Sequence, residues 1–201
     1  MKKTIFIALL VIFTPFYVLA DANIQPTILT VGFISFGYDD AQVNNAQSFL
    51  TTQAGTISAV TITTNKVGTP TGTLTIAIEA DSAGKPSGTP LGGAGTISIA
   101  SLDDYGASCA GSSNVVTLAS PATVADATTY WVTYRPDNTR DATNYLVGCG
   151  VTPGTYSDGT ESYSNNADSW TNENADINFL LTINDAVTAT PNWMSYFISF
   201  W

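Results

Sequence analysis

The sequence contains no histidine, and only six of its 201 residues are lysine or arginine. Without histidine, the chain cannot form a Ser-His-Asp or Cys-His catalytic arrangement or the usual zinc site of a hydrolase. Sixteen acidic residues give it a formal net charge of −10. Because nucleic acids and anionic lipids attract clustered Lys and Arg side chains, this composition argues against both as partners.

Charge in general is scarce, and so are long apolar runs. Only 11% of the residues are charged, compared with about 25% in a typical soluble protein. One apolar run, residues 5–13, follows Lys2 and Lys3 and precedes small residues that suit cleavage after Ala20 or after Ala22. The run is shorter than the ~20 residues of a membrane span. We therefore expect a cleaved signal peptide, no membrane span after its removal, and a secreted, extracellular or cell-surface protein.

The chain has only two cysteines, Cys109 and Cys149. An even number of cysteines in an exported chain predicts a disulfide, and two unpaired buried thiols are the alternative. Two cysteines without histidine are too few for a usual zinc site. The sequence leaves open whether the two join each other or a neighbouring chain.

What the chain does have is a series of short segments in which apolar and polar residues alternate. This period-two pattern, rich in β-branched and aromatic residues, is typical of half-buried strands separated by Gly- and Pro-containing turns. We predict an all-β fold, an antiparallel β-sandwich or jelly-roll-like single domain. A short helical turn is compatible with residues 39–47 or 101–105, and residues 152–176 read as a large polar loop with one irregular strand at 169–171. The predicted strands are residues 56–63, 73–79, 95–99, 114–118, 130–134 and 177–183.

Five segments of strand and turn residues follow one another in a recognisable order: 46–49 (AQSF), 57–62 (ISAVTI), 68–81 (GTPTGTLTIAIEAD), 84–91 (GKPSGTPL) and 127–132 (ATTYWV). Together they resemble the choice-of-anchor domain, R type, of bacterial exported and surface proteins, and the resemblance covers residues 39–184. It implies a β-sandwich on a secreted or surface-attached protein and brings no catalytic residues.

The chain accordingly divides into four parts. We expect a signal peptide at 1–20, an N-terminal strand segment at 21–38, the β-sandwich at 39–185 and an aromatic C-terminal segment at 186–201. No sorting motif or basic tail is found after Asn184, where members of the resembled family often carry one.

Catalysis would have to rest on a pair of carboxylates, as in glycoside hydrolysis. The sequence has no Gly-x-Ser-x-Gly elbow, phosphate loop or dinucleotide fingerprint. Carboxylates at strand ends and in polar loops are more often solvated than catalytic, so we expect no enzymatic activity. The candidates for such a pair are Glu79, Asp81, Glu161 and Glu173.

Clusters of acidic and amide residues suggest structural calcium, the one cofactor that the sequence favours. Calcium binds six to eight oxygen ligands, although none of these clusters matches a defined loop pattern. Solvated loops that keep an acidic protein soluble are the alternative. The clusters are Asp137, Asn138, Asp141 and Asn144; Asp168, Asn172, Glu173, Asn174 and Asp176; and Asp39 with Asp40.

Aromatic residues in the polar loop suggest an extracellular polysaccharide as ligand, because an exposed ring stacks on a sugar while amides and carboxylates bond its hydroxyls. Trp170 is the first candidate, with Tyr156 and Tyr163 nearby; anchoring of the loop is the alternative role for Trp170. Trp131, within a predicted strand, reads as core.

Self-assembly is a further expectation. Residues 24–36 are apolar and β-prone, and residues 193–201 are strongly aromatic. Such segments can donate a strand to the exposed sheet edge of another copy, and a head-to-tail contact of this kind builds filaments. Alternatively, both are the first and last strands of their own domain. We therefore expect a structural or adhesive component, with a carbohydrate-binding module as the alternative.

Overall fold

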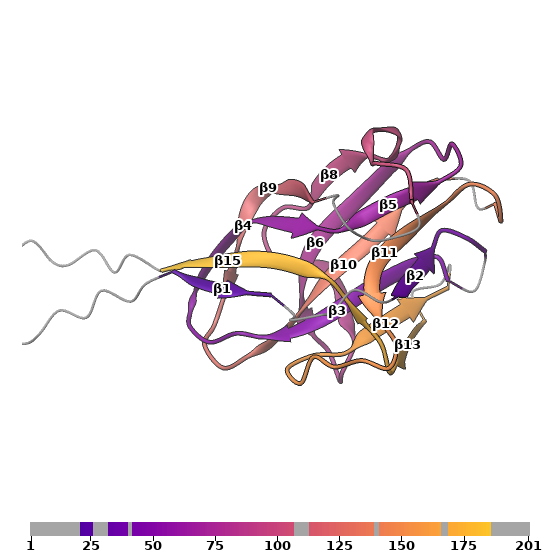
Figure 1. Cartoon of the computed structure of the whole chain (residues 1–201). Helices are drawn as coiled ribbons and strands as arrows, with labels where there is room; N and C mark the ends of the chain where they lie inside the picture. The colour runs from indigo at the N-terminus through magenta and orange to yellow at the C-terminus, as the bar shows by residue number, and fades with distance from the viewer. Residues whose placement is uncertain are drawn as a thin grey trace, which may run out of the picture.

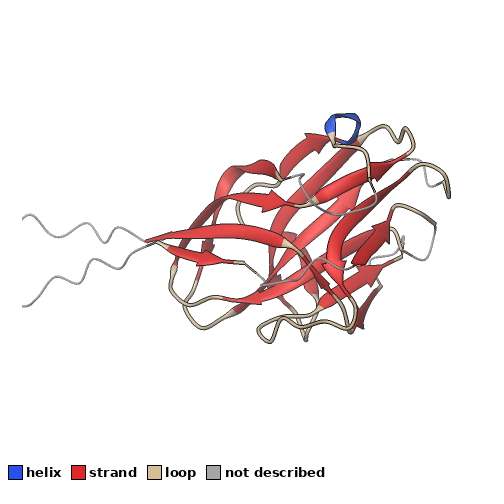
Figure 2. Ribbon diagram, in the orientation of Figure 1, coloured by secondary structure: helices blue, strands red, loops and turns tan. Residues whose placement is uncertain are grey.

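The computed structural model describes residues 21–25, 32–39, 42–106, 113–138, 141–165 and 169–185. This part of the chain is almost entirely β-strand, and its one helix is a single 3-10 turn, η1 (Ile99–Ser101) (Figure 2). Within the described ranges, no helix has the length and apolar character needed to cross a membrane.

The strands of the described residues pair into three sheets, and all of these strand pairs are antiparallel. The first sheet has the order β1-β15-β4-β9: β1 (Ala22–Ile24), β15 (Phe179–Asp185), β4 (Gly55–Ile62) and β9 (Asn114–Val124). The second has the order β13-β12-β3-β10-β6-β7: β13 (Trp170–Glu173), β12 (Glu161–Ser164), β3 (Asn44–Leu50), β10 (Thr129–Pro136), β6 (Thr73–Asp81) and β7 (Pro86–Pro90), with β8 (Gly95–Ser98) also on β6. The third has the order β14-β11-β2: β14 (Asp176–Ile177), β11 (Tyr145–Val151) and β2 (Gly32–Phe36), with β5 (Thr64–Val67) also on β11.

The first and third sheets together form one layer of the sandwich, and the second sheet forms the other. The chain passes directly between the first and third sheets from β4 to β5 and from β14 to β15, each time across a single residue. One apolar cluster joins the layers: Phe49 and Val132 from the second sheet, Val60 from the first and Phe36 from the third. Removing these side chains from water is the main favourable contribution to the fold.

The second sheet has two differently filled faces because successive side chains in a strand point to opposite sides. On β10, Val132 and Tyr134 face the sandwich core, whereas Trp131 and Arg135 lie on the outer face. The sheet also curls, since the β6–β7 turn reaches β13 near its other edge: Asn172 Nδ2 donates to the Gly84 carbonyl at 3.3 Å. The outer face is thereby closed around a small second cluster.

The predicted all-β sandwich is confirmed. The strands expected at 56–63, 73–79, 95–99, 114–118 and 130–134 correspond to β4, β6, β8, β9 and β10, and that at 177–183 spans β14 and most of β15. Within the polar stretch 152–176, β13 confirms the strand expected at 169–171, but the loop predicted for the rest is wrong in part, because β12 also lies there. Among the described residues of 39–47 no helical turn is found, and β3 begins at Asn44. The turn considered for 101–105 lies earlier than predicted, as η1, which ends at Ser101.

The two ends of the described chain lie side by side. β1 pairs with β15 in the register Ala22↔Ile183 to Ile24↔Leu181, and the Asp185 N–H donates to Asp21 Oδ1 at 3.4 Å. Figure 1 shows this pole at one end of the molecule and β2 and β12 toward the other. The predicted N-terminal segment 21–38 is therefore built into the sandwich through β1 and β2. The C-terminal segment 186–201 lies outside the described residues.

Candidate functional site

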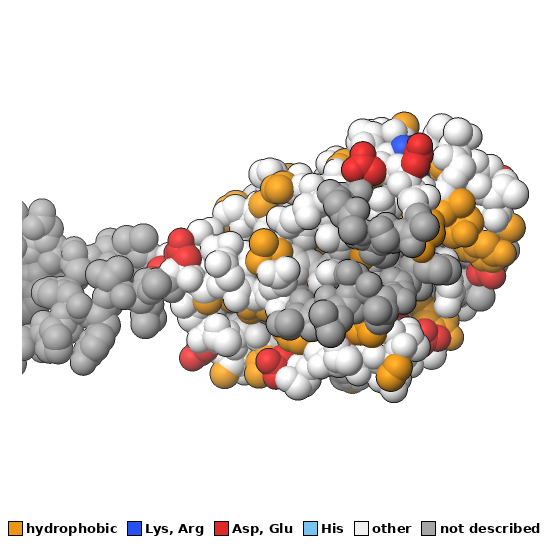
Figure 3. All heavy atoms as spheres, viewed as in Figure 1, with side chains coloured by type: hydrophobic (Ala, Val, Ile, Leu, Met, Phe, Trp, Pro, Cys, Tyr) orange, Lys and Arg blue, Asp and Glu red, His pale blue; other side chains and the backbone are white. Residues whose placement is uncertain are grey.

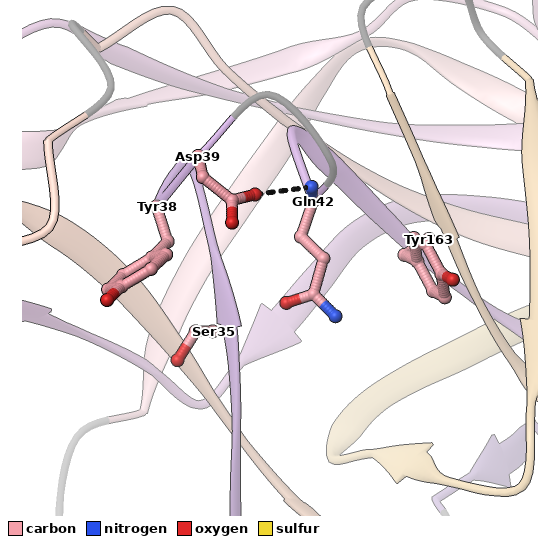
Figure 4. A pocket seen from close by; sticks show the side chains of 5 residues that line it. All are labelled: Ser35, Tyr38, Asp39, Gln42 and Tyr163. Atoms are coloured by element: carbon pink, nitrogen blue, oxygen red, sulfur yellow. Dashed lines mark hydrogen bonds between the residues drawn. The ribbon is translucent and has the colours of Figure 1, made fainter.

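A pocket of about 370 Å³ is lined by residues of β2, of the β2–β3 connection and of β12 (Figure 4). In Figure 1, β2 and β12 lie toward the end of the sandwich away from the paired chain ends. Tyr38, Asp39 and Gln42 come from the β2–β3 connection, Ser35 from β2, and Tyr163 from β12. Figure 4 shows Tyr38 and Tyr163 on opposite sides, with the Gln42 amide directed into the space between them. We call this the tyrosine pocket.

The β2–β3 connection is fixed by local hydrogen bonds. The Gly37 N–H donates to the Gln42 carbonyl at 2.9 Å, and the Gln42 N–H donates to Asp39 Oδ1 at 3.0 Å. Gly37 has φ +65°, a region that L side chains rarely adopt, and a Cβ there would lie 2.6 Å from Asn138 Oδ1. Glycine thus permits the turn that brings Tyr38 and Gln42 to the pocket.

The Tyr38 ring is held by a neighbour and remains open to solvent. It is 38% exposed, and its ring meets that of Tyr145 edge-to-face with centroids 4.9 Å apart. Such aromatic pairs prefer this geometry. Figure 3 shows hydrophobic side chains gathered at the end of the molecule that carries the β2–β3 and β10–β11 connections.

The chemistry of the lining suits a neutral, hydroxyl-rich ligand. Two phenol rings offer apolar faces, while the Ser35 hydroxyl and the Gln42 amide can both donate and accept hydrogen bonds. The described lining includes one carboxylate, Asp39, and no basic side chain, which disfavours an anion. Small-ligand pockets typically have volumes of about 300–1,000 Å³, so this one accommodates about one sugar ring.

The three aromatic residues predicted to bind a ligand are not brought together. Tyr163 lines the pocket. Because Tyr163 is registered with Thr171 and Ser164 with Trp170, Trp170 points to the opposite face of the sheet. Tyr156 follows β11, packs against the main core, and has its pKa raised to about 12, chiefly by burial and then by Asp158.

The ligand-stacking role predicted for Trp170 does not fit its position, because the side chain is only 5% exposed. It packs with Ala46 and Trp131, and the Arg135 guanidinium lies 5.4 Å from its ring centroid. The burial of Trp170 could not be predicted without knowing which face of the sheet carries its side chain and what covers that face. The alternative role, anchoring, describes Trp170 better.

The first predicted calcium cluster consists of loop-capping residues. Asp137 accepts the Thr73 N–H, and Asn138 lies buried with its amide donating to the Gly37 carbonyl. Asp141 accepts from Asn144 Nδ2, the Thr143 N–H and the Thr143 hydroxyl, and these bonds, in that order, lower the pKa of its carboxyl. Asn144 Oδ1 in turn accepts the Thr69 N–H at 2.8 Å. Oxygens of Asp137, Asp141 and Asn144 thus already accept hydrogen bonds from donors of the protein itself.

The described residues of the second predicted calcium cluster are also dispersed. Asp168 and Asp40 lie outside the described residues. Glu173 is exposed on β13, whereas Asp176 is buried and accepts the N–H groups of Thr155 and Tyr156 at 2.5 and 2.7 Å. Within the described ranges, no three acidic or cysteine side chains are placed to hold a metal ion. The calcium hypothesis thus gains no site.

None of the four candidate catalytic carboxylates is among the residues that line the tyrosine pocket. Contrary to the expectation of solvation, Glu79 and Glu161 are 1% and 0% exposed. Glu79 lies on the outer face, 3.1 Å from Arg135 Nη2, and Glu161 lies on the inner face, bonded to Asn45. Asp81 lines a second pocket of about 340 Å³, where it accepts the Trp131 indole N–H at 2.8 Å.

Ser35, Tyr38 and Gln42 were not predicted as site residues. The available signal was the Gly37-Tyr38-Asp39 turn directly after a β-prone segment, and it was weak. Cys149 is buried in β11, whereas Cys109 lies outside the described residues, so their pairing stays a prediction.

Comparison with family models, curated proteins and solved structures finds no match to this chain. The family resemblance therefore rests on the sequence motifs alone.

Proposed function

We propose that this chain is a non-catalytic, secreted or surface-displayed adhesive β-sandwich that binds a neutral carbohydrate in the tyrosine pocket. The observation that carries the proposal is the pairing of two tyrosine rings with the hydroxyl and amide groups of Ser35 and Gln42 at one end of the sandwich. The paired chain ends leave from the other end. A ligand could therefore be bound at the end remote from any attachment through the chain termini.

Replacing either Tyr38 or Tyr163 with alanine is expected to weaken carbohydrate binding at least tenfold. Each substitution removes one of the two rings that would stack on the sugar, while the Ser35 and Gln42 groups remain. The mature protein is first screened on an array of neutral glycans, and titration calorimetry with the best glycan then gives the affinity of each variant.

Two variants serve as controls. Val115→Ala alters a side chain on β9 that is 66% exposed and far from the pocket lining, and it should bind like the wild type. Tyr38→Phe keeps the ring and should retain most of the affinity. A blank array, or equal affinity in the Tyr38→Ala and Tyr163→Ala variants, would refute carbohydrate binding at this site.

Self-association through strand exchange is a second candidate. Within the predicted donor segment 24–36, the described residues pair inside their own domain: Ile24 is the last residue of β1, and residues 32–36 form β2. However, β1 has only three residues at a sheet edge, so its exchange between two copies would break few contacts. In that case deletion of residues 21–25 should abolish oligomers seen by light scattering. A monomeric wild-type protein at high concentration would exclude this candidate.

A further inference from the structure

Glu161 is a buried acid next to the tyrosine pocket. It lies on β12, two residues before Tyr163, so both side chains leave the same face of the strand. Its Oε1 accepts a hydrogen bond from Asn45 Nδ2 at 2.7 Å. Within the described part of the chain, Glu161 Oε2 and Asn45 Oδ1 are buried without a hydrogen-bond partner. Unsatisfied buried acceptors are costly and require an explanation.

The groups around Glu161 offer no positive charge. Glu173 lies directly opposite on β13, and the buried Asp176 lies nearby on β14. On β3, Asn45 and Gln47 share its face, and both are neutral. Three tyrosines lie in this region: Tyr163 on the same face of β12, Tyr134 of β10, which is registered with Asn45, and Tyr156. Burial raises the pKa of Tyr134 and of Tyr156.

The described basic side chains are all bonded elsewhere. Lys66 pairs with Asp104, Lys85 donates to the Trp170 carbonyl, and Arg135 pairs with Glu79 on the other face of the sheet. An ionised Glu161 would thus be a desolvated charge among other carboxylates. Burial first and Glu173 second raise the pKa of Glu161 to about 8, although the Asn45 hydrogen bond opposes the change.

We propose that Glu161 is held as a neutral acid that clasps β12 to β3 through Asn45 and positions Tyr163, so that proton loss in mildly alkaline solution loosens the tyrosine pocket. A neutral carboxyl group donates from one oxygen and accepts at the other, and a primary amide does the same. Donation of the Oε2 proton to Asn45 Oδ1, together with the existing amide bond, gives both orphan oxygens a partner. Proton loss removes that donor and leaves a buried charge.

The direction of the pH effect follows from proton linkage. The folded protein keeps the Glu161 proton at pH values where the unfolded chain, with an ordinary Glu pKa near about 4.3, has lost it. The clasp therefore contributes its full stability below about pH 4, and this contribution declines as the pH rises toward about 8. Above that pH, Glu161 is ionised in both states and no further change is expected from it.

Thermal unfolding of the wild type and two variants between pH 5 and pH 9 tests the clasp. Glu161→Gln keeps the shape and the paired hydrogen bonds without titrating, so its Tm should exceed that of the wild type by at least about 5 °C at pH 9. The wild-type Tm should fall across this range more steeply than that of Glu161→Gln. Glu79→Gln is the matched control, since it removes the other buried glutamate: it should lower the Tm and keep the wild-type slope.

Parallel wild-type and Glu161→Gln profiles would overturn the proposal. So would a calcium-dependent rise of the wild-type Tm that Glu161→Gln lacks, because Oε2 would then be a cation ligand. The coupling to the pocket is read from the ring signals of Tyr163 in NMR spectra. These should shift between pH 6 and pH 9 in the wild type and remain fixed in Glu161→Gln; signals that remain fixed in both would refute the coupling.

The role of the clasp in regulating ligand binding rests on the proposed carbohydrate function, but the test of the clasp itself does not. The Tm profiles and the Tyr163 signals need no sugar, so they decide the clasp even where the glycan array is blank. Conversely, equal glycan affinity at pH 6 and pH 9 would agree with the proposed function but refute the regulation of binding by the Glu161 proton.

Discussion

Replacing Trp170 with alanine is expected to lower the free energy of unfolding by about 3–5 kcal/mol, the usual cost of truncating a buried Trp. The side chain fills the closed outer face of the curled sheet with Ala46 and Trp131, and its loss leaves a cavity there. The Arg135 guanidinium above the ring would also lose its aromatic partner, and cation–π contacts contribute about 0.5–2 kcal/mol. Urea denaturation of the wild type and the variant measures the difference.

The same variant separates anchoring from ligand contact. Trp170 points away from the face that carries Tyr163, so at a temperature where the variant is folded its glycan affinity should remain within about twofold of the wild type. Trp170→Phe, which keeps part of the ring, should lose less stability than Trp170→Ala. A loss below about 1 kcal/mol for Trp170→Ala would contradict the buried position.

Replacing Arg135 with glutamine is expected to cost about 3–5 kcal/mol, because it removes one partner of a largely buried ion pair. Glu79 is 1% exposed, and its carboxylate accepts from Arg135 Nη2 at 3.1 Å, the Gly88 N–H at 2.6 Å and the Thr133 hydroxyl at 3.3 Å. Without the guanidinium, a buried charge is left with neutral donors only.

A double-mutant cycle identifies the cause of this loss. Adding Glu79→Gln to Arg135→Gln removes the orphaned charge, so the double variant should be more stable than Arg135→Gln alone. If the stability losses of the two single variants simply add in the double variant, Arg135 and Glu79 are not energetically coupled. The ion pair would then not explain the cost of Arg135→Gln. Val115→Ala, an exposed substitution on β9, should change the stability by less than about 0.5 kcal/mol.

The strands that were predicted from the sequence are those whose inner faces are apolar. In β6, Leu74, Ile76 and Ile78 alternate with Thr75 and Ala77, so the core face is visible in the pattern. In β3, the inner positions Asn45 and Gln47 are polar because they bond Glu161 and Asp176 rather than pack in the apolar cluster. Because the inner faces of β3 and β12 are polar, hydrophobic alternation could not predict these two strands.

The site was predictable only in part because its residues come from distant segments. Tyr163 was singled out as an aromatic residue in a polar stretch, and it does line the pocket. Tyr38 and Gln42 lie more than 120 positions earlier in the sequence, and only the pairing of β12 with β3 brings them close to Tyr163. The sequence could not show which face of β13 carries Trp170, since that depends on the strand register.

The buried glutamates show a similar limit. From the sequence, Glu79 at a strand end and Glu161 in a polar loop were both expected to be solvated carboxylates. Their burial depends on tertiary partners far along the chain: Arg135, 56 positions after Glu79, and Asn45, 116 positions before Glu161. The residues next to each glutamate in the sequence do not indicate such distant partners.

The most direct test of carbohydrate binding in the tyrosine pocket is an NMR titration of the mature protein with the best neutral glycan from the array. Saturating glycan should shift the signals of Ser35, Tyr38, Gln42 and Tyr163 and leave those of Trp170 and Val115 in place. Shifts confined to another surface, such as the second pocket around Asp81, or no shifts with any glycan, would contradict the assignment of the pocket.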